Sequence, residues 1–548
     1  MSYPRTIQPL IIEDQSDAKD YYEVVLDSSV KNGTVAPPRF AFSYEEGSRL
    51  LGENTIYHLV ILDLRLPEAP GRPESSALDF GLSLLDQCIN RNAYPIPVLL
   101  VISGHLDQAN QRDLDARVRD GVAYGRVLVK SNNLEDDLLA AVREAQRYCD
   151  IGIHIRDGGE ARYPTLSPRD EDLLRRCVLR QGECIGLNLE WWADEYSRPT
   201  GKFKEYKGWT KTFMGRFLLD RGVGPSRPTF FKLAPTGGAE SVAQEAQISG
   251  HKLSHIKVCS ALIAGDRSLL VTQKVGESNE RPISLATFLG RLADQIQQAI
   301  PAIVESVADQ VSALGELTPY QTPISNLLWE GHDKERIHNE WRKYSIGLDR
   351  PIGLDLDLDP TQLDPTLVLD RLTTNVSQVH FNRQTCLHGD LNITNIALDD
   401  IVTGPRAYIF DVSGCLPGVN VRDLAMLEVT ALLHQPADGE QTLVQHCMAL
   451  YRDKVDIPDD LDFAHGSNRA RNTLNLLAEI RKQALRRAKP SIYALMVFDC
   501  ALIQLAGLAW PSGNKIYHPA DAALLASLTA NWLRRVAPEF FGNPENQS

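Results

Sequence analysis

Four short apolar runs near the N-terminus constrain the fold of this chain more than any other feature of its sequence. The runs read PLIIED, HLVILDLRLP, PVLLVISG and RVLVKS, and longer amphipathic stretches separate them between Gln8 and Cys149. Apolar runs without polar alternation are typical of strands that are buried on both faces of a parallel sheet. Their alternation with amphipathic stretches predicts a doubly wound α/β unit.

Polar side chains stand where these predicted strands end. Glu13 and Asp14 follow the first run, and Asp63, Ser103 and Lys130 end the other three. Because the site of such a sheet lies at the carboxyl ends of its strands, we expect the five groups to converge. This set suits phosphoryl transfer to a carboxylate, with Asp63 as nucleophile and as a Mg²⁺ ligand beside Glu13 and Asp14. Lys130 would neutralise the phosphoryl charge, and Ser103 would hydrogen-bond the phosphoryl group.

In this order the residues resemble the receiver domain of bacterial response regulators. The acidic pair, the D-L-x-L-P context of Asp63, the S-G at Ser103 and the K-S at Lys130 carry the resemblance over about the first 150 residues. It implies a flavodoxin-like fold, bound Mg²⁺, and phosphorylation by a cognate histidine kinase or a small phospho-donor. The chain departs from the family at Leu128, where an aromatic switch residue is usual, and in the enlarged loop Leu66–Ala77. Any one of the carboxylates could instead be a helix cap or turn residue.

A second set of reactive residues lies in LHGDLNITNIALDD and the following AYIFDVSG. His388, Asp390 and Asn395 form an H-x-D-x-x-x-x-N pattern, and Asp411 ends a short apolar run. Phosphoryl transfer from ATP needs a carboxylate that orients or deprotonates the acceptor hydroxyl, together with oxygen ligands for Mg²⁺. Asp390 suits the first role, and Asn395 and Asp411 suit the second.

These residues resemble the catalytic loop of the aminoglycoside phosphotransferase and choline kinase group, which shares the protein-kinase fold. HGDLNITN has Gly389 and the asparagine spacing of that group, and IFDVSG lacks the Phe-Gly that follows Asp411 in protein kinases. The V-R-D-L-A run with Asp423 matches a segment that braces the loop in those enzymes. The resemblance implies an α+β bilobal kinase-like domain that uses ATP and Mg²⁺ on an unidentified hydroxyl acceptor. Standing alone, Asp390 could be a loop cap.

The same resemblance implies a nucleotide-binding lobe upstream of the catalytic loop. The β-like run PTFFKLAP carries Lys232, which would reach the ATP phosphates. Glu245 in the following helical stretch could pair with this lysine, and Glu240 is the rival partner. A single lysine on a strand is otherwise commonly a solvated surface residue.

Two further segments complete the expected nucleotide site. Gly208 and Gly215 would allow a hairpin to approach the phosphates closely, although the chain has no G-x-G-x-x-G. Gln273 to Val275 would meet adenine through backbone groups at the end of a strand. Both assignments follow from order within the family.

The chain is too long for one ordinary hydrophobic core. Gly-Gly and two prolines after Asp150 indicate a linker. We predict a receiver at 1–150, a linker at 151–169, a small nucleotide-binding lobe at 170–280, and a mostly helical large lobe at 281–548. One large-lobe helix carries a charged face that we expect to be solvated, with a substrate-phosphate site as the alternative: Arg481, Lys482, Arg486 and Arg487.

Composition restricts the partners and the compartment. The net charge of -14 argues against a broad duplex-DNA surface, and no DNA-binding helix-turn-helix is evident. The nine cysteines contain no C-x-x-C pair, as fits a reducing cytosol. The apolar run from Ala494 to Trp510 contains Asp499 and Gln504, so we expect a buried helix there. We therefore expect a cytoplasmic bacterial protein that has no membrane segment.

Three functions agree with these patterns. The first is a phosphotransferase that the receiver controls. The second is a nucleotide-binding pseudokinase or scaffold that changes protein partners when Asp63 is phosphorylated, which the missing Gly-rich signature favours. The third is a component of a bacterial conflict or defence system. The acceptor, the partner proteins and a homodimeric state are left open.

Overall fold

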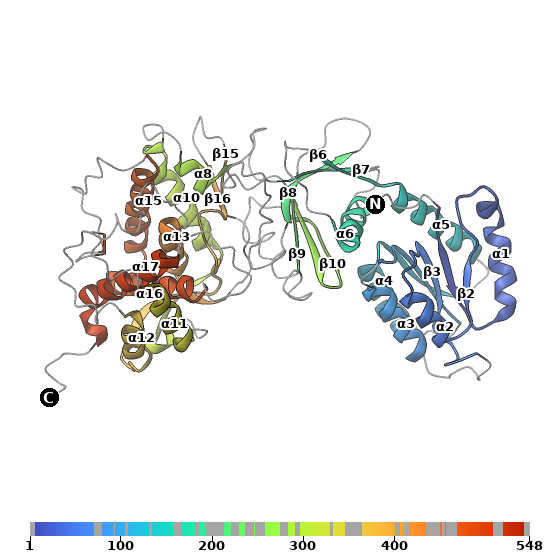
Figure 1. Ribbon diagram of the computed structural model, residues 1–548, viewed down its shortest axis with the longest axis horizontal. Helices are drawn as coiled ribbons and strands as arrows, with labels where there is room; N and C mark the ends of the chain where they lie inside the picture. Colours follow the sequence, from blue (N-terminus) through green and yellow to red (C-terminus); the bar gives the residue numbers. More distant parts are fainter. Residues whose placement is uncertain are drawn as a thin grey trace. The chain divides into compact units, whose positions relative to one another are not determined.

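The protein was examined as a computed structural model that divides into two compact units (Figure 1). The N-terminal unit comprises Met1–Tyr206, Thr210–Ala243 and Val258–Lys274, and the C-terminal unit comprises the rest. The structure describes residues 6–70, 79–91, 94–104, 108–130, 134–156, 166–180, 186–191, 213–220, 229–235, 246, 258–273, 283–290, 296–328, 333–345, 364–399, 406–409, 412, 416–433, 450–451, 455, 468–507 and 519–541.

A five-stranded parallel sheet opens the N-terminal unit, in the order β2-β1-β3-β4-β5. Its strands are β1 (Pro9–Ile12), β2 (Arg39–Ala41), β3 (Leu59–Asp63), β4 (Val98–Ser103) and β5 (Tyr124–Val129). This is the flavodoxin-like strand order. The four apolar runs are β1, β3, β4 and β5, so the predicted parallel sheet is confirmed. The sequence pattern did not mark the short edge strand β2.

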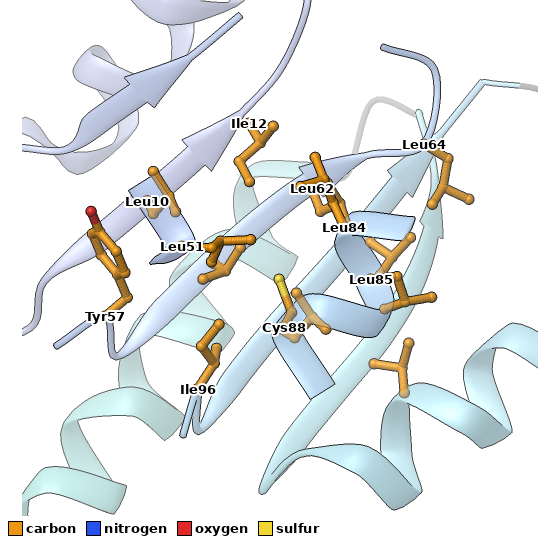
Figure 2. Close-up of a cluster of buried hydrophobic side chains, with 14 of the residues drawn as sticks. Leu10, Ile12, Leu51, Tyr57, Leu62, Leu64, Leu84, Leu85, Cys88 and Ile96 are labelled. Atoms are coloured by element: carbon orange, nitrogen blue, oxygen red, sulfur yellow. The ribbon is translucent and has the colours of Figure 1, made fainter. Parts of the chain in front are cut away.

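Helices cover both faces of this sheet (Figure 1). Helices α1 (Ser16–Lys31) and α5 (Leu134–Asp150) pack on one face, and α2 (Tyr44–Gly52), α3 (Asp79–Asn90) and α4 (Gln108–Gly121) pack on the other. Figure 2 shows Leu10, Ile12 and Leu62 on the second face, beside Leu84 of α3. Ile11 belongs to the opposite core with α1 and α5. Neighbouring strand residues point to opposite faces, which explains why the runs are apolar throughout.

A six-stranded sheet follows, in the order β10-β11-β9-β8-β7-β6, and only its β6–β7 pair is parallel. Its strands are β6 (Gly152–Arg156), β7 (Gly186–Trp191), β8 (Phe213–Asp220), β9 (Thr229–Pro235), β10 (Val258–Ala264) and β11 (Arg267–Gln273). Residues 152–156 lie inside the predicted linker but form edge strand β6. Ile153 packs against the apolar core that contains Leu173 and Leu233, and this contact stabilises the strand.

Helix α6 (Pro168–Arg180) joins the two sheets of the N-terminal unit. Its residues Leu173 and Val178 share one apolar core with Tyr148 of α5, Leu233 of β9 and Val271 of β11. The parallel sheet and the six-stranded sheet are therefore connected through continuous packing.

The C-terminal unit is mostly helical in the part that the structure describes, in agreement with the sequence. Its helices are α8 (Leu285–Leu289), α10 (Ile300–Ala313), α11 (Lys334–Ser345), α12 (Pro365–Thr373), α13 (Arg422–Leu433), α15 (Asn468–Leu485), α16 (Pro490–Gly507) and α17 (Pro519–Val536), with 3-10 turns η1 (Ile324–Asn326) and η4 (Pro538–Phe541). Two small sheets accompany them, β12-β15-β16 and β13-β14-β17. Their strands are β12 (Ile283–Ser284), β13 (Leu317–Pro323), β14 (Gln378–Gln384), β15 (Ile396–Asp399), β16 (Arg406–Ile409) and β17 (Gly418–Val419).

Helix α16 is the buried helix expected from the apolar run near the C-terminus. By length and composition alone it could cross a membrane, but 72% of its apolar window is buried inside the protein. It packs against α13 and α17. The polar Asp499 in its middle is fully buried.

Arg481 on α15 is not part of a solvated helix face, so the expectation for this residue is wrong. Its side chain is 1% exposed, and its guanidinium donates to Glu428 of α13 at 2.8 Å. The guanidinium also lies 5.0 Å from the ring centre of Tyr451 and 4.9 Å from that of Trp532. The hydroxyl of Tyr493 donates to Glu428 at 2.6 Å. Arg481 turns inward because residues of other helices surround its position on α15.

We expect Glu428→Gln to lower the free energy of unfolding by about 3 to 5 kcal/mol, because it leaves the Arg481 charge buried without a carboxylate. Lys482→Met is the control, since Lys482 is exposed and its ion pair with a described residue is the surface pair with Glu479. That change should cost no more than about 1 kcal/mol. Both values can be measured by chemical denaturation, and equal losses for the two variants would contradict the buried pair.

Candidate functional site

The first candidate site lies at the carboxyl ends of β1, β3 and β5. Ligand oxygens of Glu13, Asp14 and Asp63 lie within 4.8 Å of one another. The Nζ atom of Lys130 is 2.7 Å from Asp63 and 3.0 Å from Glu13. Ser103 is buried at the end of β4, and its carbonyl accepts from the Lys130 amide at 3.2 Å. The structure thus brings the five predicted residues to one edge of the sheet.

Burial and mutual repulsion control the charges of this site. Burial of Glu13, and next the charge of Asp63, raise the pKa of the Glu13 carboxyl to about 8. Burial alone would lower the pKa of the Lys130 ammonium, but its hydrogen bonds to Asp63 and Glu13 and their charges raise it. The Glu13 carboxyl is therefore mostly protonated at neutral pH.

The three carboxylates fit a divalent cation. Carboxylate oxygens are the ligands that Mg²⁺ prefers, and a bound cation would offset the burial and the Asp63 charge that raise the pKa of Glu13. Asp63 and Glu13 are almost fully buried, whereas Asp14 is half-buried. The cluster is therefore open to solvent on the side of Asp14. Of the enlarged loop predicted beside it, residues 71–77 lie outside the described part of the chain.

The second candidate site is the loop between β14 and β15. Its backbone amides at His388 and Gly389 donate to the two carboxylate oxygens of Asp423, at 2.7 and 2.9 Å. Gly389 has a φ of 83°, which favours glycine at this turn. His388 and Asp423 are buried, while Asp390 is exposed. The loop is therefore fixed from inside and presents the Asp390 carboxylate to solvent.

Two asparagines hold the rest of this loop. The Nδ2 of Asn395 donates to the Asp390 carbonyl at 2.9 Å, which leaves its amide oxygen available as a metal ligand. Asn392 accepts from the amides of Thr394 and Asn395 at 2.9 and 3.2 Å. The sequence analysis did not single out Asn392, although an asparagine in a turn commonly accepts from backbone amides a few residues further along. Asp411 lies outside the described residues.

Cys386, two residues before His388, is disulfide-bonded. The scattered cysteine pattern did not predict a disulfide. The other cysteines whose side chains the structure describes are free: Cys88, Cys149, Cys177 and Cys500. The start of the loop is thus also held by a covalent bond.

The residues predicted to bind nucleotide are described in part. Lys232 is half-buried on β9, where it pairs with Leu270 of β11. Gly215 lies in β8, and the backbone of Gln273 ends β11. The other predicted residues lie outside the described part of the chain: Gly208, Glu240, Glu245 and Val275.

Comparison with known proteins leaves the family open. No protein-family model matches the chain, and no curated protein sequence matches it. Similar solved structures include an ethanolamine kinase from Plasmodium vivax, with 13% identity over 58% of this chain and 79% of that chain and a TM-score of 0.26. A microcompartment-associated aminopropanol kinase has 12% identity over 60% and 90%, with a TM-score of 0.27. An aminoglycoside-3'-phosphotransferase of type VIII has 17% identity over 48% and 88%, with a TM-score of 0.23. Scores this low do not establish a common fold.

We expect the affinity of the N-terminal unit for Mg²⁺ to rise between pH 6 and pH 8, by up to about tenfold per pH unit. The raised pKa of Glu13 means that the metal must displace a proton from its carboxyl in this range. In metal-free protein the same shift makes the folded state lose stability as pH rises toward 8, because the unfolded state has already released that proton. Calorimetric titration with Mg²⁺ measures the slope, and Glu13→Gln should flatten it. A wild-type affinity that does not change with pH would contradict the proton competition.

Proposed function

We propose that this chain is a two-component-type signalling protein of the bacterial cytoplasm, in which a receiver phosphorylated at Asp63 regulates a phosphotransferase. The phosphotransferase would use ATP and Mg²⁺ to phosphorylate an alcohol group. One observation carries the proposal. Each unit presents a carboxylate that suits phosphoryl chemistry: Asp63 stands beside a lysine, and Asp390 stands on a loop fixed by Asp423.

The geometry at Asp63 supports the receiver. Its carboxylate oxygen would attack the phosphorus of the donor, and the leaving group would take the electron pair of the broken bond. Lys130 already touches Asp63 at 2.7 Å, so its ammonium is in place to neutralise the added phosphoryl charge. Bound Mg²⁺ would supply further positive charge at the phosphoryl oxygens.

The geometry at Asp390 supports the phosphotransferase. An exposed carboxylate can accept the proton of an acceptor hydroxyl, while its backbone stays in place through Asn395 and Asp423. Such preorganisation is the main contribution that a protein makes to phosphoryl transfer. The motif resemblance to aminoglycoside phosphotransferases and choline kinases agrees with these roles.

A nucleotide-binding pseudokinase is the second candidate. The chain has no G-x-G-x-x-G, which favours a scaffold that changes partners when Asp63 is phosphorylated. The intact set of His388, Asp390, Asn395 and Asp411 favours catalysis instead. Either protein could serve in a bacterial conflict or defence system.

Asp390→Asn should leave Mg·ATP binding largely intact and lower the turnover of ATP by about two orders of magnitude or more, because it removes acid-base chemistry. Asp411→Asn should weaken Mg·ATP binding, because it removes a metal ligand. Calorimetry measures Mg·ATP binding and ADP formation measures turnover, so together they separate the two effects. Wild-type protein that binds no Mg·ATP would refute the nucleotide site, and binding without turnover would favour the pseudokinase.

Helix α6 gives the receiver a direct contact with the sheet that carries Lys232. The hydroxyl of Tyr148 on α5 donates to the buried Asp172 of α6 at 2.9 Å. Arg176 of α6 pairs with Asp172 at 2.5 Å and donates to the Gly121 carbonyl at 2.8 Å. A shift of α4 or α5 would therefore reach the six-stranded sheet without crossing a linker.

Phosphorylation of Asp63 should change the affinity for Mg·ATP or its turnover by about 5 to 150 fold, the usual range for coupled sites. Acetyl phosphate with Mg²⁺ serves as the donor, and Asp63→Asn should show no response. Tyr148→Phe should reduce the response, because it removes the hydrogen bond between α5 and α6.

Tyr57→Phe provides the matched control for this experiment. Tyr57 is another buried receiver tyrosine, and its hydroxyl accepts from Arg39 rather than contacting α6. Identical nucleotide affinity and turnover in phosphorylated and unphosphorylated wild type would refute regulation by the receiver. A response that Tyr148→Phe and Tyr57→Phe reduce equally would refute the route through α6.

A further inference from the structure

A buried ion pair stands directly behind the segment that holds the catalytic loop. Arg422 begins α13, and its guanidinium lies 2.8 Å from the carboxylate of Asp499 in the middle of α16. The Asp499 side chain is fully buried, and that of Arg422 is 19% exposed. Asp423, the next residue along α13, accepts both loop amides. Arg422 thus directly precedes Asp423, the residue whose carboxylate holds the loop.

Further contacts fix the same end of α13. The Sγ of Cys500 donates to the Arg422 carbonyl at 3.8 Å, so α16 contacts this residue through both backbone and side chain. Asn420, just before the helix, donates to the Arg487 carbonyl at 3.3 Å. The first turn of α13 therefore cannot rotate without breaking contacts to two neighbouring segments.

The energetics indicate that the Arg422–Asp499 pair orients the start of α13 more than it stabilises the fold. The neighbours of Asp499 on α16 include the buried apolar residues Val497, Phe498 and Leu502. Burying a carboxylate and a guanidinium costs several kcal/mol of desolvation, and apolar residues of similar volume are often at least as stabilising. An apolar pair, however, lacks the directional attraction that orients the backbone of Arg422 and Asp423.

We propose that Asp499 is a positioning residue, which through Arg422 aims the Asp423 carboxylate at the amides of His388 and Gly389 and so holds Asp390 in its reactive place. This inference rests on the proposed phosphotransferase for its effect on turnover. Its effect on the loop itself does not depend on catalysis. Asp499 touches neither the loop nor Asp390 in the described contacts.

The test compares full-length wild type with Asp499→Asn and with the double variant Arg422→Met/Asp499→Leu, which stays folded if removal of one charge alone unfolds the protein. Tyr493→Phe is the matched control. Tyr493 also lies on α16 and reaches α13, but at Glu428, whose described hydrogen bonds go to Tyr451, Arg481 and Tyr493 and not to the loop. All four proteins are compared at matched fractions of folded protein.

Two readouts are measured. Hydrogen–deuterium exchange with mass spectrometry follows peptides that contain His388 and Gly389, and ADP formation from Mg·ATP gives kcat and KM. We expect faster exchange in these peptides for both Asp499 variants, a kcat that is about 10 to 100 fold lower, and an unchanged KM for ATP. Tyr493→Phe should match wild type in both readouts.

Unchanged exchange at His388 and Gly389 in both Asp499 variants would overturn the inference. An equal increase in Tyr493→Phe would also overturn it, because the effect would then be general loosening of α13 and α16. If wild type forms no ADP from ATP, the proposed phosphotransferase fails, while the exchange measurement still decides whether Asp499 positions the loop. Faster exchange with an undiminished kcat would limit Asp499 to a structural role and overturn the positioning inference.

Discussion

Buried charge that must be neutralised inside apolar packing is the constraint on which the functional segments of this protein depend. A charged group away from water is tolerated when a partner compensates for it. Asp423 is almost fully buried because two backbone amides satisfy its oxygens, and those amides belong to the loop of Asp390. Asp63 is almost fully buried beside Lys130. In both places, satisfying a buried carboxylate also sets the position of reactive groups.

The same constraint connects segments that lie far apart in the sequence. Asp172 and Arg176 are buried between α5 and the six-stranded sheet, and Arg176 also binds a backbone carbonyl at the end of α4. Arg481 is buried against Glu428, so that α13 and α15 are held together. Because removing one partner leaves the other uncompensated, these pairs hold their helices in specific positions even where they add little net stability.

In the proposed signalling role, this arrangement would couple the two sheets of the N-terminal unit more directly than a free tether would. The α5 and α6 helices share apolar core and a hydrogen bond between Tyr148 and Asp172, so the two sheets of the N-terminal unit form one packed body. A change in the charge of Asp63 would act on packed elements, which respond by discrete shifts rather than by gradual deformation. The absence of an aromatic residue at position 128 is then less restrictive, because packed helices offer another route.

The sequence by itself determined the parallel sheet and the residues at its edge, because strands buried on both faces must be apolar and their carboxyl ends must meet. It also marked the loop of His388, Asp390 and Asn395, since that chemistry needs fixed spacing along a short segment. Only the tertiary structure decided that residues 152–156 are a strand, that Arg481 turns inward, and that Asp499 faces Arg422. Each of these features depends on partners that are distant in the sequence. Arg481 and Glu428 are 53 residues apart, and β6 is a strand because it pairs with β7. Local periodicity carries no information about such partners, because burial there is created by packing between elements.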